Sequence, residues 1–129
     1  MLQHPQQSKV DVVNKPWGVT RCIHRDATHE VWHASIVGGG FSSRHKHERK
    51  PNKFYVLCGR MWVHTFKEEG FGVPQSSALL GPGDEITIPD GMWHQFEVEQ
   101  NCSVELIEIY WAYLKGEDII RAVRPESAT

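Results

Sequence analysis

Short runs of hydrophobic residues, separated by clusters of turn-forming residues, make up most of this sequence. The runs are rich in β-branched and aromatic side chains, and several alternate with polar ones, a pattern typical of β-strands. We expect strands at 10–13, 31–38, 53–58, 60–66, 85–88, 94–98 and 104–112. Glycine, proline, asparagine and aspartate interrupt the runs at close intervals, as in 81–84 and 89–91. This spacing favours an antiparallel sandwich or small barrel.

The turns also predict which strands pair. Gly59 alone separates 53–58 from 60–66, so these two runs are expected to form a hairpin. The runs 94–98 and 104–112 are expected to pair in the same way across a short polar turn. Both predictions treat strands that are neighbours in the sequence as neighbours in one sheet.

Composition limits the chain to one globular domain. It has 129 residues, of which 40% are hydrophobic and 23% charged, and a chain of this size forms one core. We expect a flexible segment at 1–9, one domain over 10–122 and a tail at 123–129. Eleven glycines and seven prolines leave little room for long helices, and only 115–122 is expected to form a short helix.

The net charge, the hydrophobic pattern and the cysteine content argue against a nucleic-acid-binding, membrane or secreted protein. The formal net charge of −2 gives no electrostatic reason to expect nucleic acid as a partner. No stretch approaches the roughly 20 apolar residues of a membrane span, and no apolar leader follows Met1, so a membrane partner or secretion is not expected. Cys22, Cys58 and Cys102 form no CxxC pair and are odd in number, which favours free thiols in a cytoplasmic protein.

The eight histidines include three whose spacing indicates a metal site. His45 and His47 lie two residues apart, so on an extended strand both imidazoles point to the same side. On spacing alone they could instead be two surface histidines in a charged loop. His94 follows the tight turn at 89–91, and a residue placed there at the start of a strand can face the pair across a barrel.

Two glycine-framed motifs contain these histidines. From Gly39 to Gly59 the sequence reads G-x5-H-x-H-x4-N-x6-G, and from Gly83 to His94 it reads G-x5-P-x-G-x2-H. In internal spacing and in order, the two strings resemble the two motifs of the cupin superfamily. The resemblance implies an all-β fold, a double-stranded β-helix or jelly-roll barrel, with at most one short C-terminal helix.

The resemblance also implies one divalent metal ion, held by His45, His47, His94 and a carboxylate. Here the carboxylate position is Asn52, which could coordinate the metal, contact a metal-bound water, or leave the position open. Zn, Fe, Mn, Ni and Co all suit three imidazoles, so the sequence does not choose among them. The alternative is a cupin used only as a scaffold, with metal-free histidines.

The flanking segments resemble one group more closely, the type II mannose-6-phosphate isomerase cupins. Residues 15–18 read KPWG, and 104–121 is similar to that group's closing segment. If the likeness extends to function, it implies aldose–ketose isomerisation. Glu108 would then be the base or a carboxylate supporting a metal ligand, Tyr110 would share its face of the strand, and Arg121 would anchor a phosphate.

The sequence departs from that group at three places, namely Asn52, the residues after His94, and 124–126. Two further expectations concern the ligand, since His64 and Trp62 could line the cavity that holds a small molecule. Cupins often pair through their terminal strands, which implies a homodimer. Two other functions stay open: a three-histidine iron-dependent dioxygenase, and non-enzymatic binding of a small polar molecule such as a sugar derivative.

Overall fold

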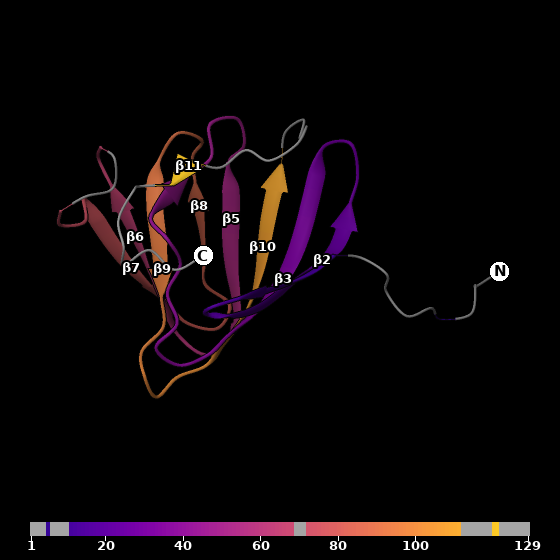
Figure 1. Ribbon diagram of the computed structural model, residues 1–129, viewed down its shortest axis with the longest axis horizontal. Helices are drawn as coiled ribbons and strands as arrows, with labels where there is room; N and C mark the ends of the chain where they lie inside the picture. The colour runs from indigo at the N-terminus through magenta and orange to yellow at the C-terminus, as the bar shows by residue number, and fades with distance from the viewer. Residues whose placement is uncertain (1–4, 6–10, 69–71, 112–119, 122–129) are drawn as a thin grey trace.

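The computed structural model describes residue 5 and residues 11–68, 72–111 and 120–121, which form two antiparallel sheets packed face to face (Figure 1). The first sheet has the strand order β1-β2-β3-β10-β5-β8, and the second has the order β11-β4-β9-β6-β7. The strands are β1 (Val12–Lys15), β2 (Gly18–Arg25), β3 (His29–Ile36), β4 (His45–Lys46), β5 (Asn52–Cys58), β6 (Met61–Phe66), β7 (Ser76–Leu80), β8 (Glu85–Ile88), β9 (Trp93–Glu97), β10 (Val104–Trp111) and β11 (Ile120–Arg121). This architecture confirms the predicted all-β jelly roll.

The core lies between the two sheets, because alternate residues of each strand face inward. In β5 the inward residues are Asn52, Phe54 and Val56, each at most 1% exposed. The second sheet contributes Val63 and Phe96, and the rings of Phe96 and Trp17 pack edge to face with 5.2 Å between centroids. Burying these large apolar side chains is the main force that holds the two sheets together.

Both predicted hairpins are wrong. β5 pairs with β10 and β8 in the first sheet, whereas β6 pairs with β9 and β7 in the second. β9 and β10 likewise lie in different sheets (Figure 1). Gly59 and the turn after β9 therefore carry the chain across the sandwich. A turn of this kind has the same composition as a hairpin turn, so the sequence alone does not distinguish the two.

Other element boundaries also differ from the predictions. β2 and β7 were not expected, since their polar and small residues lack a strong strand pattern. Of the predicted helix 115–122, only Ile120 and Arg121 fall within the described residues, and they form a strand that pairs with β4. Among the described residues, no helix is long and apolar enough to span a membrane.

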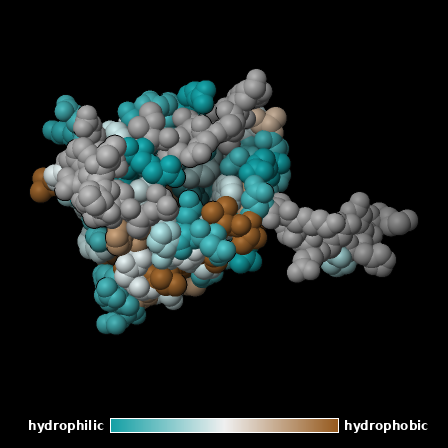
Figure 2. Space-filling model, viewed as in Figure 1, coloured by the Kyte–Doolittle hydropathy of each residue, from teal (hydrophilic) through white to brown (hydrophobic). Residues whose placement is uncertain are grey.

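Several large hydrophobic side chains are exposed on the described part of the chain. Figure 2 shows one face on which hydrophilic residues dominate and hydrophobic ones form small separate spots. The most exposed are Val73 at 88% and Val12 at 61%. Val12 begins β1, which is an edge strand of the first sheet. The homodimer expected through this terminal strand stays a prediction, as do the domain bounds and the cytoplasmic location.

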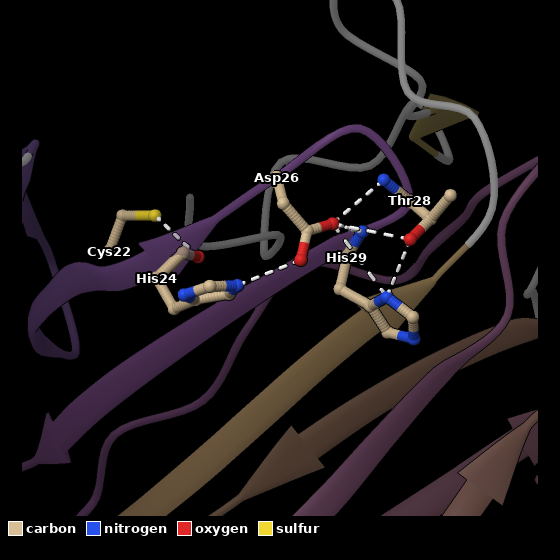
Figure 3. Close-up of polar contacts among 5 residues, drawn as sticks. All are labelled: Cys22, His24, Asp26, Thr28 and His29. Atoms are coloured by element: carbon tan, nitrogen blue, oxygen red, sulfur yellow. Dashed lines mark hydrogen bonds and ion pairs between the residues drawn. The ribbon is translucent and has the colours of Figure 1, made fainter.

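The turn between β2 and β3 is held by Asp26 (Figure 3). One carboxylate oxygen accepts hydrogen bonds from the backbone N–H groups of Thr28 (2.8 Å) and His29 (2.7 Å), and the other lies 2.8 Å from Nε2 of His24. These contacts, the His24 one above all, lower the pKa of Asp26. An aspartate that caps backbone groups in this way fixes the turn.

We expect Asp26→Ala to lower the melting temperature, whereas Asp26→Asn should lower it less, because asparagine retains an oxygen for the backbone N–H groups. A carboxyl whose pKa is lowered by folding stabilises the protein above its unfolded pKa of about 4 and loses that contribution below it. The difference between wild type and Asp26→Ala should therefore shrink from pH 5 to pH 2. Thermal melts at both pH values test this, and an unchanged difference would contradict it.

Candidate metal centre

Three buried histidines gather at one point between the sheets. His45 lies on β4 and His94 on β9, where the two residues face each other across the ladder, and His47 follows two residues after His45. Their exposed fractions are 7%, 1% and 4%. One nitrogen from each ring lies within 4.8 Å of the others. The predicted alternation along the extended segment therefore places both imidazoles of the H-x-H pair on the inner side.

Backbone carbonyls orient two of these rings. Nδ1 of His45 donates to the carbonyl oxygen of Ser43 at 2.8 Å, and Nδ1 of His94 donates to that of Met92 at 3.0 Å. A proton held on Nδ1 leaves the lone pair on Nε2, which is the atom that can bind a metal. The buried Nε2 of His94 receives no hydrogen bond from any described residue. These contacts fix the orientation of the His45 and His94 rings and leave Nε2 as the atom that can bind a metal.

Burial also keeps these imidazoles neutral. Desolvation lowers the pKa of His94 to about 4, with His47 adding to the effect and the bond to Met92 opposing it. The pKa of His45 is likewise lowered well below its ordinary value, chiefly by desolvation and then by His94 and His47. A neutral imidazole is the form that binds metal ions, so His45 and His94 are in the metal-binding form at neutral pH.

The first sheet supplies the opposite wall. Tyr110 on β10 packs its ring against His47, with 5.2 Å between centroids, and its strand partner on β5 is Asn52. Glu108, two residues before Tyr110, accepts hydrogen bonds on one carboxylate oxygen from the Tyr110 hydroxyl (2.7 Å) and from Nδ2 of Asn52 (2.9 Å). The face of β10 that holds Tyr110 is thus the inner one, which the alternation alone did not decide.

Burial governs the ionisation of this wall as well. Desolvation raises the pKa of Glu108 to about 7, against the opposing effects of the Tyr110 hydrogen bond and the nearby charge of Lys50. The pKa of Tyr110 is raised well above its usual value, first by desolvation and then by the charge of Glu108. Lys50 lies over the Tyr110 ring, with Nζ 4.1 Å from the centroid. No pattern in the sequence indicated Lys50, because its position depends on a loop.

The residues fit a divalent metal ion. Oδ1 of Asn52 is buried and receives no hydrogen bond within the described part of the chain, as is also true of Nε2 of His94. Buried polar atoms rarely stay unsatisfied, and such an atom requires an explanation. Three imidazoles and an amide oxygen form an uncharged N3O donor set, which suits Zn, Fe, Co and Ni among the divalent ions.

The other predicted site residues lie elsewhere. Trp62 and His64 occupy the outward positions of β6, because its inward positions are Met61, Val63 and Thr65. His64 is held there by Ser77 and Glu97, each at 2.6 Å, so these two residues do not line the space between the sheets. Arg121 is the strand partner of His45, and its side chain is exposed. The alternation along β6 thus places Trp62 and His64 on the outer face of the second sheet.

A groove of about 390 Å³ lies between the edge strands β7 and β8. Its lining includes Thr65, the strand partner of His94, and Ile88, the strand partner of Asn52. Met92, whose carbonyl orients His94, lines it as well. The groove thus runs alongside residues that support the histidine triad.

No protein-family model matches the sequence, and no curated protein matches it significantly. Solved structures match at full-domain length. The polyketide cyclase RemF from Streptomyces resistomycificus is 16% identical with a TM-score of 0.72, over 98% of this chain and 89% of that one. A variant of Streptomyces PAC13 with uridine is 18% identical with a TM-score of 0.70, over 98% of both chains.

A third similar structure is described by the name of its domain type. Rru_A2000 from Rhodospirillum rubrum, described as a cupin-2 domain, is 16% identical with a TM-score of 0.70, over 94% of this chain and 80% of that one. At these identities the likeness concerns the fold. The fold of this chain is therefore similar to that of a cupin-2 domain, and the closer resemblance to mannose-6-phosphate isomerases stays a prediction.

Proposed function

We propose that this protein is a metal-binding cupin in which one divalent ion is held by His45, His47 and His94, with Asn52 as a fourth donor. The observation that carries the proposal is the pair of buried acceptor atoms, Nε2 of His94 and Oδ1 of Asn52, left without hydrogen bonds among the described residues. They come from opposite sheets, on either side of the gap that Tyr110 spans to His47.

We further propose that the site binds a small polar ligand, such as a sugar derivative. The groove between β7 and β8, which is lined by the strand partners of His94 and Asn52, offers space for such a ligand. A similar fold has been solved with uridine, which supports the binding of polar small molecules by cupin-type domains. Fold likeness alone does not identify the ligand. The resemblance of the closing segment to sugar-phosphate isomerases favours a sugar phosphate as the first candidate.

For an isomerase, the chain must supply a proton acceptor beside the bound sugar. When bound, a divalent ion polarises a carbonyl oxygen. Glu108 is the carboxylate that faces the site and stays the candidate base for moving a proton between adjacent carbons. Tyr110 holds that carboxylate through its 2.7 Å hydrogen bond, and Arg121, exposed on β11 beside β4, stays the candidate phosphate anchor.

We expect protein purified without a histidine tag to contain one divalent ion per chain, as measured by elemental analysis. The metal-loaded protein incubated with mannose 6-phosphate should then form fructose 6-phosphate, detected by a coupled assay. Absence of stoichiometric metal would contradict the metal site. Metal without product would remove the isomerase activity and favour a protein that binds its ligand without turnover, tested by ligand-dependent melting temperature.

A further inference from the structure

Asn52 occupies the position at which the cupin resemblance implies a carboxylate ligand. Its hydrogen-bond partner Glu108 places a carboxyl group directly beside the amide. The Asn52 amide donates to Oε2 of Glu108 at 2.9 Å across two adjacent strands, β5 and β10. Tyr110 donates to the same oxygen at 2.7 Å. The carboxylate is thus held by two hydrogen bonds at the wall of the metal centre, and one of them comes from the amide itself.

The hydrogen bond decides which end of the amide faces the site. An asparagine side chain can present either its oxygen or its NH2 group, and only the oxygen can bind a cation. A carboxylate accepts hydrogen bonds and cannot donate one, so Glu108 requires that Nδ2 of Asn52 point toward it. Oδ1 is thereby turned away from Glu108, and it is this atom that lies buried without a hydrogen bond from the described residues.

Charge provides the second argument. Three neutral imidazoles and a neutral amide leave the full charge of a divalent ion uncompensated in a buried site, which is costly. In its ionised form, Glu108 places a negative charge one hydrogen bond behind the amide of Asn52. Carboxylates that hydrogen-bond a metal ligand orient it and raise its basicity, and their loss weakens metal affinity about 10- to 100-fold.

We propose that Asn52 and Glu108 together replace the single carboxylate ligand. Asn52 provides the donor oxygen. Glu108 acts as a positioning residue, which fixes the orientation of the amide and supplies the negative charge that a carboxylate ligand would bring. The inference rests on the proposed metal site. It assigns to Glu108 a role in metal affinity that is separate from proton transfer, and it makes the contribution of Glu108 depend on which residue occupies position 52.

The test is a double-mutant cycle of four proteins: wild type, Glu108→Gln, Asn52→Asp, and the double variant. The dissociation constant for Co²⁺ is measured by competition with a chelating indicator, and the visible absorption of bound Co²⁺ reports its coordination. With Asn52 present, Glu108→Gln should weaken binding about tenfold or more and change the spectrum. In the Asn52→Asp background, where the aspartate brings its own charge and two equivalent oxygens, the same change should cost less than about threefold.

Glu105→Gln is the matched control, because Glu105 lies on the same strand but contacts Ser35 and His33 on the outer face. It should leave Co²⁺ affinity unchanged, and circular dichroism confirms that each variant is folded. An equal loss from Glu108→Gln in both backgrounds, or no loss in either, would overturn the inference while the wild type still binds metal. Wild-type protein that binds no Co²⁺ would instead overturn the proposed metal site itself.

Discussion

Replacing His94 with glutamine is expected to weaken divalent metal binding at least about 100-fold, since a buried imidazole is lost from a three-histidine set. His94 is 1% exposed and stands opposite His45, with its ring already oriented by Met92. Glutamine is uncharged and can still donate to the Met92 carbonyl, so the variant should fold. The measurement is the dissociation constant for Zn²⁺ by chelator competition.

Thermal stability provides an independent measurement of the same loss. A ligand that binds only the folded state at about 1,000 times its dissociation constant adds about 4 kcal/mol of stability, which corresponds to a rise in melting temperature of roughly 10 °C or more for a chain of this size. Wild type should show this rise on addition of Zn²⁺, and His94→Gln should not. His64→Gln is the control, because His64 lies on the outer face with Ser77 and Glu97.

A loss of the Zn²⁺-dependent rise in His64→Gln as well would show that the metal is not held by the triad. Retention of the full rise in His94→Gln would contradict the metal centre directly. Both variants remove one histidine, so the total number of imidazoles is the same in both proteins. The comparison therefore isolates the position of the residue rather than the number of imidazoles.

The histidine triad was predictable because its geometry is largely local. His45 and His47 share a face through the two-residue period of extended chain, and glycine-framed turns fix where each motif begins. The same period placed Leu106, Glu108 and Tyr110 on one face of β10, and only the structure shows that this face is inward, with Leu106 1% exposed. Which face of β10 points into the core is decided by tertiary packing, and the alternation of residues along the strand does not encode it.

Strand pairing was not predictable from the same signals. A turn with glycine joins two strands whether the chain reverses within one sheet or crosses to the other, since both need a residue at positive φ. The pairing is decided by which strands, distant in sequence, bury each other's inner faces. The outward positions of Trp62 and His64 follow from this, because the sheet that contains β6 presents Val63 to the core. Lys50 above Tyr110 depends on a loop conformation that no periodicity encodes.

Gly59 is the residue at which this crossing between sheets is most constrained, and Gly59→Ala is expected to destabilise the fold by about 3 kcal/mol or more. Its φ is +85°, and a Cβ added there would lie 2.0 Å from the backbone carbonyl oxygen of Ser103. Ser103 immediately precedes β10, so the turn after β5 packs against backbone rather than against a side chain that could rotate away. Relief would require β10, which carries Glu108 and Tyr110, to shift.

Gly83 offers a matched control, because its φ is also +85° but an added Cβ would meet nothing within 4 Å. Gly83→Ala should therefore cost only the conformational strain, about 1 kcal/mol. Urea unfolding monitored by tryptophan fluorescence gives both free energies of unfolding. Equal losses in the two variants would show that left-handed backbone strain alone accounts for Gly59. A much larger loss at Gly59 would show that close contact with the segment before β10 fixes the crossing from β5 to β6.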